Sequence, residues 1–217
     1  TATNGKIFET LAFNNKHQAV NPVTGQAITP TPFHTTSLGF SVNPGQALPT
    51  LNLNRLFILS TGGTCSASEA IINGLNGINV EIILIGSTTC GKPYGFYATD
   101  NCAITYFSVQ FKGENDIGFG DYSDGFTPMN TVGTVGELVS GCSVADDFYN
   151  ALGDPLEGQL AAALLYRETG SCPTPATIAA NPLKNKKLDN PDSLFNSDYY
   201  QKLNLLTENR IIQPPQQ

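Results

Sequence analysis

Leu56-Phe-Ile-Leu-Ser-Thr-Gly-Gly-Thr-Cys-Ser-Ala-Ser-Glu69 and Ile82-Ile-Leu-Ile-Gly-Ser-Thr-Thr-Cys-Gly-Lys-Pro93 are the two segments that predict the core of this protein. Each opens with an apolar run that is too short for a helix and has the length of a buried strand. We therefore expect strands over residues 55–60 and 80–85. In the first segment a glycine turn follows the strand, and a serine stands where a helix should begin.

The sequence between the two expected strands has a helical repeat. Ala67, Ile71 and Leu75 recur every four residues, which predicts an amphipathic helix that ends near Gly74 to Gly77. A strand, a helix and a second strand in so short a segment predict a right-handed βαβ unit with parallel strands. The fold class expected from the residues is therefore α/β.

A serine and a lysine follow the ends of the two expected strands. Ser66 stands at the first turn of the helix, and Lys92 lies between Gly91 and Pro93. A serine hydroxyl becomes a good nucleophile only when a base removes its proton, and lysine can do so only as the neutral amine, which apolar surroundings favour. The pattern predicts Ser66 as a nucleophile and Lys92 as its general base. The backbone N–H of Ala67 would then point at a developing oxyanion.

The same residues also allow a structural interpretation. Ser66 and Glu69, ahead of an apolar helix, have the spacing of a capping box, in which the two side chains bond the backbone of the first turn. Ser66 would then only cap a helix, and the chain would be a non-catalytic binding or scaffold domain. A Ser-His-Asp triad that uses His34 is a further alternative, although a lone histidine in a loop is usually only solvated.

The segment 86–92 resembles a nucleotide-binding motif as well. It matches the phosphate-loop pattern G-x-x-x-x-G-K and follows a strand. The motif requires Ser or Thr next, to bind magnesium, and this chain has Pro93. The motif should also open a helix, which residues 93–97 do not predict. These two departures argue against nucleotide binding.

Composition excludes several classes of protein. The chain has 217 residues, of which 40% are hydrophobic, enough to bury one core and a small appendage. The net charge of -7, with no basic cluster larger than residues 184–187, argues against a nucleic-acid surface. No apolar run approaches the roughly 18 residues of a membrane span. The chain opens with Thr1 rather than Met and shows no signal peptide.

The cysteines predict neither a metal site nor a cofactor. They show no C-x-x-C pairing and no histidine at metal spacing, so zinc is not expected. Scattered cysteines with little Met and Lys are compatible with an oxidising compartment. Buried free thiols are one interpretation. If Ser66 and Lys92 are neighbours, Cys65 and Cys90 must also lie close together, and this pair is then a candidate disulfide. The five cysteines are Cys65, Cys90, Cys102, Cys142 and Cys172, and Cys142 with Cys172 is the other candidate pair.

The rest of the chain predicts three regions. Residues 1–50 form a loop-rich strip with short strands near Lys6–Phe13 and Gly39–Val42, residues 51–172 an α/β core, and residues 173–217 a surface tail. Within the core we expect a strand over 103–111, paired after a turn at 99–101, and a glycine-rich loop over 118–130. A helix over 154–169 should be capped by Asp154, with Leu156, Leu160, Ala163 and Leu164 on one face.

The two opening segments resemble a known family. Thr64-Cys65-Ser66-Ala67-Ser68-Glu69 matches T-x-S-A-S-E, and Thr89-Cys90-Gly91-Lys92 matches T-x-G-K, of the carboxyl-terminal processing (tail-specific) proteases. The resemblance runs from about Lys6 to Arg210 and is densest over 55–97, with looser matches at 125–128, 146–147 and 152–155.

This resemblance implies a crotonase-like fold, with a ββα superhelix core, and a serine peptidase with a Ser66/Lys92 dyad. The family cleaves polypeptides near apolar C-termini without metal or cofactor, in the periplasm or outside the cell. Many members carry a glutamine four residues after the lysine, to orient it. This chain has Phe96 there, which leaves Glu69 as the possible orienting residue.

The resemblance also implies that part of the protease is missing. The family's second oxyanion donor comes from a glycine-rich loop that would precede Thr1, and no peptide-gripping PDZ domain is present. The chain is therefore expected to be the C-terminal portion of a larger catalytic region, with the missing N-terminal part as its partner. Without that part the activity should fall, because losing one oxyanion donor costs a factor of about 100 to 1,000 in rate.

Overall fold

The structure is a computed structural model that describes residues 3–17, 20–39, 42–133 and 136–174. The chain divides into two compact units. The first unit comprises residues 1–96 and 109–173, and the second comprises residues 97–108 and 174–217. The fold is mixed α/β, with two helices among the described residues and several small sheets.

A parallel sheet forms the centre of the first unit. Its strands, in spatial order, are β11 (Gly141–Ser143), β4 (Glu81–Gly86) and β3 (Arg55–Ser60). Helix α1 (Ala67–Asn76) connects β3 to β4, which confirms the predicted strand–helix–strand unit with parallel strands. The last residues of the three strands, Ser60, Gly86 and Ser143, pair in register. The carboxyl ends of the three strands therefore meet at one edge.

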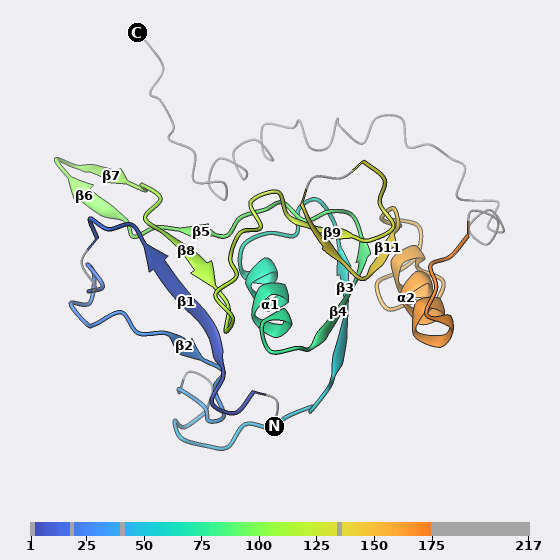
Figure 1. Cartoon of the computed structure of the whole chain (residues 1–217), viewed down its shortest axis with the longest axis horizontal. Coiled ribbons are helices and arrows are strands. Elements are labelled where there is room, and N and C mark those ends of the chain that lie inside the picture. Colours follow the sequence, from blue (N-terminus) through green and yellow to red (C-terminus); the bar gives the residue numbers. More distant parts are fainter. Residues whose placement is uncertain (1–2, 18–19, 40–41, 134–135, 175–217) are drawn as a thin grey trace, which may run out of the picture. The chain divides into compact units, whose positions relative to one another are not determined.

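Both faces of β4 are buried, which explains its continuous apolar run. Ile82 and Leu84 pack with Ile72 of α1 on one face. Ile83 and Ile85 pack on the other face against α2 (Gly158–Thr169), the second helix of the described chain. The two helices thus lie on opposite sides of the parallel sheet (Figure 1).

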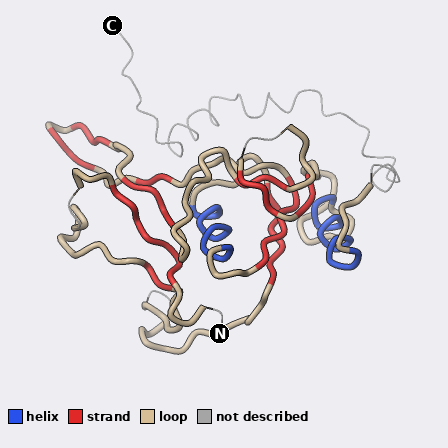
Figure 2. Tube along the Cα trace, in the orientation of Figure 1, coloured by secondary structure: helices blue, strands red, loops and turns tan. Residues whose placement is uncertain are grey.

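A second, antiparallel sheet covers the far side of α1, so this helix lies between two sheets (Figure 2). Its strands, in spatial order, are β2 (Thr31–Pro32), β1 (Ile7–Phe13), β8 (Phe111–Glu114) and β5 (Tyr94–Gly95). Gly74 of α1 packs against Phe8 of β1 so closely that a Cβ at Gly74 would lie 2.8 Å from the Phe8 ring. The predicted strand near Lys6–Phe13 is therefore confirmed, and it packs on the helix.

Two elements differ from prediction inside the first unit. The expected loop 118–130 contains β9 (Phe126–Pro128), which pairs in parallel with β10 (Glu137–Val139). The second helix starts later than predicted. Asp154 does not cap it, because its carboxylate accepts the Leu156 N–H in a turn, and Glu157 is the N-cap instead.

The buried faces of both helices are rotated from those expected. Ile71 of α1 is 46% exposed, whereas Glu69, Ile72, Asn73 and Gly74 are buried. A buried carboxylate and a close contact with β1 decide which side of α1 turns inward, and apolar periodicity detects neither. In the second helix, Leu156 lies before the first turn and is exposed.

The second unit contains a short hairpin of β6 (Thr99–Asn101) and β7 (Ile104–Tyr106). The predicted turn at 99–101 is therefore a strand. The turn lies at Cys102 and Ala103, both of which have positive φ, as the tightest hairpin turns require. The expected strand 103–111 is divided, because residues 107–110 are in neither β7 nor β8.

Parts of two expectations lie outside the described residues. Phe40 and Ser41, in the middle of the strand expected over Gly39–Val42, belong to the undescribed part. The same holds for residues 175–217, which make up nearly all of the expected surface tail.

Candidate functional site

Two segments that carry the predicted dyad lie against each other at the carboxyl edge of the parallel sheet. The turn after β3 leads into Ser66, and the segment after β4 leads into Lys92. The Cys90 N–H donates to the Thr64 carbonyl at 3.0 Å. Cys65 and Cys90 form a disulfide with their Cα atoms 5.3 Å apart, which confirms the first candidate pair.

Glu69 connects the same two segments through its side-chain carboxylate. Its side chain is completely buried, and it lies on α1 one turn after Ser66. Oε2 accepts the Ser66 N–H at 2.9 Å and the Lys92 N–H at 2.8 Å. Oε1 accepts the Gly91 N–H at 2.7 Å. Because one oxygen binds both amides, the backbone nitrogens of Ser66 and Lys92 lie within two hydrogen-bond lengths of each other.

Ser66 has an unusual backbone conformation. It is the N-cap of α1 with φ 54° and ψ -108°, and its side chain is exposed. Such a conformation costs a residue other than glycine about 1 to 3 kcal/mol and persists only where the surroundings hold it. The Ser66 hydroxyl faces the Glu69 N–H and the Glu69 carboxylate faces the Ser66 N–H, so both contacts of the predicted capping box are present, although the hydroxyl contact falls short of a hydrogen bond. Only the other half of the predicted capping box, from the Ser66 N–H to the Glu69 carboxylate, has a hydrogen bond of normal length.

Ala67 is the first residue of α1. The N–H groups of a helix's first turn have no intrahelical carbonyl partner, and the helix dipole makes them favourable partners for negative charge. The Ala67 N–H therefore belongs to the first turn of the helix, directly after the N-cap residue Ser66.

Lys92 and the preceding Gly91 are half-buried, and the following Pro93 is buried. Gly91 has φ 78°, and a Cβ there would overlap the Ser123 carbonyl oxygen. Gly125 has φ 82°, and a Cβ there would overlap the Thr89 carbonyl oxygen. Two glycines thus allow the segment that carries the lysine to pack directly on the loop before β9.

Thr89 is a site residue to which sequence reasoning gave no role. It is buried, and its hydroxyl donates to Glu69 Oε1 at 2.6 Å while accepting the Phe126 N–H at 2.8 Å. The hydroxyl thereby links the glutamate to β9. The threonine belongs to the T-x-G-K match, so the motif contained the signal. Its contact with Glu69, 20 residues earlier in the chain, depends on the fold.

The buried surroundings of Glu69 affect a neighbouring phenol. Tyr122 is almost fully buried and stacks on Phe126, with ring centroids 4.7 Å apart. Burial, and then the negative charges of Glu69 and Glu9, raise the pKa of Tyr122 well above its usual value. The phenol therefore remains protonated over the whole neutral range.

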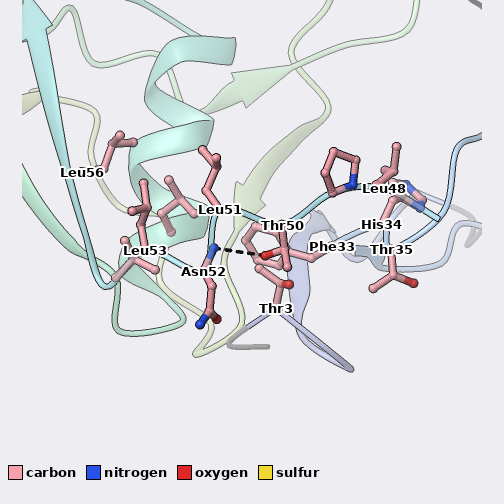
Figure 3. Close-up of a pocket in the computed structure, with 13 residues that line it drawn as sticks. Thr3, Phe33, His34, Thr35, Leu48, Thr50, Leu51, Asn52, Leu53 and Leu56 are labelled. Carbon is pink, nitrogen blue, oxygen red and sulfur yellow. Dashed lines mark hydrogen bonds between the residues drawn. The ribbon is translucent and has the colours of Figure 1, made fainter.

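A hollow of about 430 Å³ lies at the other end of α1 from Ser66 (Figure 3). Its wall includes His34, together with Leu56 near the start of β3 and Leu75 near the end of α1. The hollow is largely apolar and is separate from the Ser66 and Lys92 segments, because none of their residues lines it. His17, the other histidine, stacks on Phe13 at the end of β1.

The described residues include no group of three or more His, Cys, Asp or Glu side chains that could hold a metal ion. Among the same residues, neither helix has the length and apolar character needed to cross a membrane.

Comparison with known proteins identifies a similar fold. No protein-family model and no curated protein matches the chain. Its structure is similar to a crystal structure from Bacteroides fragilis that is provisionally named an S41 protease, the family of the tail-specific proteases. The TM-score is 0.52 at 22% identity, over 78% of this chain. This chain spans only 38% of that protein. At this identity the likeness concerns the fold alone.

Proposed function

We propose that this chain is the dyad-bearing part of a serine endopeptidase of the tail-specific type, built on a crotonase-like core. The observation that carries the proposal is the shared oxygen of Glu69, which brings the backbones of Ser66 and Lys92 together. The fold similarity to a protein provisionally named an S41 protease supports the same class of enzyme.

In this mechanism Lys92, as the neutral amine, takes the proton from Ser66 Oγ as that oxygen attacks the scissile carbonyl carbon. The Ala67 N–H stabilises the oxyanion of the tetrahedral intermediate. The intermediate collapses as the Lys92 ammonium returns its proton to the leaving amine, which leaves an ester on Ser66. Water, deprotonated by Lys92, then hydrolyses that ester and frees the serine. Glu69 is a positioning residue, because its hydrogen bonds go to the backbone of both dyad residues.

The proposed substrate is a polypeptide that is cleaved near an apolar C-terminus. The proposed partner is the remainder of a longer protein, which would supply the second oxyanion donor. The location proposed is the periplasm or the outside of the cell, and the disulfides Cys65–Cys90 and Cys142–Cys172 support it, since such bonds persist in oxidising compartments.

Two observations favour catalysis over the alternative in which Ser66 only caps α1. A capping serine normally has an extended backbone, whereas Ser66 has positive φ, although both contacts of a capping box are present at this helix start. In addition, a cap needs no lysine segment fixed beside it. A triad with His34 is less well supported, because His34 lines the hollow at the opposite end of α1.

The test is peptidase activity of the full-length protein with Ser66→Ala, and Ser68→Ala is the matched control. Both serines are exposed in the same turn, two residues apart. Ser66→Ala should lower kcat by more than about a thousandfold with little change in stability. Ser68→Ala should retain normal kcat. Full activity in Ser66→Ala would exclude this serine as the nucleophile, and the capping interpretation would then be preferred.

A further inference from the structure

The Cys65–Cys90 disulfide occupies a particular place in the chain. Cys65 immediately precedes Ser66, and Cys90 lies two residues before Lys92. The bond therefore joins the turn after β3 to the segment after β4. These are the two segments on which the proposed nucleophile and base are carried.

The disulfide also adjoins the strained residue of the site. The positive φ of Ser66 can persist only if groups on both sides of it are held in place. On the helical side, Glu69 accepts the Ser66 N–H. On the other side, the only covalent restraint is the disulfide at Cys65, which the Cys90-to-Thr64 backbone hydrogen bond accompanies. Loss of the disulfide would leave that side of Ser66 held by hydrogen bonds alone, chiefly those from the Cys90 N–H to the Thr64 carbonyl and from the Ser68 N–H to the Cys65 carbonyl.

The second disulfide offers a natural comparison. Cys142 and Cys172 have a Cα separation of 5.5 Å and a sequence separation of 30, against 25 for Cys65 and Cys90. As simple cross-links, two loops of such similar length should stabilise the fold to a similar extent. Cys142, however, lies in the core cluster beside α2, and its disulfide joins β11 to the chain after α2, neither of which carries Ser66 or Lys92.

We propose that the Cys65–Cys90 disulfide is a positioning element of the dyad, so that peptidase activity depends on its redox state. The inference rests on the proposed function and adds a form of control to it. A dithiol would give two electrons and two protons to the bond, forming two cysteine thiols while it closes to its own cyclic disulfide. Ser66 could then relax toward an ordinary helix-start conformation, and its hydroxyl would lose alignment with Lys92. Reoxidation would restore the bond and the alignment.

The test uses the full-length protein in two double variants, Cys65→Ala/Cys90→Ala and Cys142→Ala/Cys172→Ala. We expect the melting temperatures of both to fall, and that of the second at least as much as that of the first, because Cys142 is fully buried in the core. Only the first should lose turnover, with kcat reduced about ten- to a hundredfold and KM nearly unchanged, because misalignment affects the reacting groups more than substrate binding. The second should keep kcat within about twofold of the wild type. Retention of kcat in the first variant would overturn the proposal.

A second arm avoids substitution at the site. In the Cys142→Ala/Cys172→Ala background, dithiothreitol should lower activity while circular dichroism remains native, and removing the reductant in air should restore the activity. If the activity and the native circular dichroism signal were lost together, the disulfide would serve only to stabilise the fold, and the inference would be overturned. If the wild type is active and Ser66→Ala is not, the proposed function stands even when neither the double variants nor reduction shows an effect of the Cys65–Cys90 disulfide on activity. A wild type as inactive as Ser66→Ala would overturn both.

Discussion

The backbone N–H groups of Ser66 and Lys92 donate to one and the same oxygen, Oε2 of Glu69. The two residues lie 26 positions apart in sequence and follow different strands. A buried carboxylate is well suited to join them, because each oxygen can accept more than one hydrogen bond. The geometry of the proposed dyad therefore depends on a third residue that would touch neither the substrate nor the transferred proton.

Glu69→Gln should lower both stability and turnover. The amide places an NH2 group where one carboxylate oxygen now accepts N–H or O–H donors, so at least one buried donor loses its partner. We expect the free energy of unfolding to fall by about 3 kcal/mol, measured by urea denaturation. The kcat of the folded variant should fall at least about tenfold, because the two backbones are no longer held together.

Glu157→Gln is the matched control for that change. Glu157 is also buried, and its carboxylate accepts the N–H groups of Gln159 at 3.0 Å and Leu160 at 2.7 Å at the start of α2. Its replacement should cost about 1 to 2 kcal/mol of stability, as loss of a helix cap does. The kcat should stay normal. Equal losses of kcat in both variants would mean that Glu69 acts only through stability.

Gly91→Ala should disturb the segment that carries Lys92, and Gly133→Ala provides its control. The two glycines have similar positive φ, 78° and 73°, so the conformational penalty for alanine is similar. A Cβ at Gly91 would overlap the Ser123 carbonyl, whereas nothing lies within 4 Å of one at Gly133. Gly91→Ala should therefore lose about 1 to 3 kcal/mol more than Gly133→Ala in denaturant unfolding. Equal losses would contradict the tight packing described for this segment.

Stability should decline in alkali because of Tyr122. Its pKa in the folded protein lies above the unfolded value of 10.0, so folding favours the protonated phenol. The stabilisation is complete below pH 10.0 and is lost as the pH rises from there through the folded pKa. The free energy of unfolding should fall by up to about 1.4 kcal/mol per pH unit in that range.

Tyr122→Phe should flatten this pH dependence in denaturant unfolding curves, whereas substitution of the exposed Tyr106 by Phe should leave it unchanged. An equally steep decline in Tyr122→Phe would assign the effect to another group.

The parallel core was predictable because its central strand, β4, is buried on both faces and so reads as the continuous apolar run 82–85. The turn at Cys102 and Ala103 was not, because neither residue is a typical turn former and both nevertheless adopt positive φ. The start of α2 was misplaced for a related reason. Asp154 has the side chain of a good cap, but its carboxylate is used in the preceding turn.

For the site, the sequence predicted that two segments meet, but it did not predict how their residues are connected. Ser66, Lys92, Ala67 and Glu69 all belong to the two segments that the structure brings together. The disulfide between Cys65 and Cys90 was a candidate for the same reason. The roles of Thr89 and Gly91 depend on β9 and on the loop before it, which come more than 30 residues later in the chain. Contacts of that kind have no local signature.

The kcat of Lys92→Arg in the full-length protein, measured beside wild type and Lys92→Ala, tests the dyad most directly. Arginine keeps the positive charge and much of the size of lysine, but it cannot give up a proton to become a base. The account predicts that both variants lose activity by more than about a thousandfold while remaining folded. Substantial turnover in Lys92→Arg would show that the residue supplies only charge, and it would contradict a Ser66/Lys92 dyad.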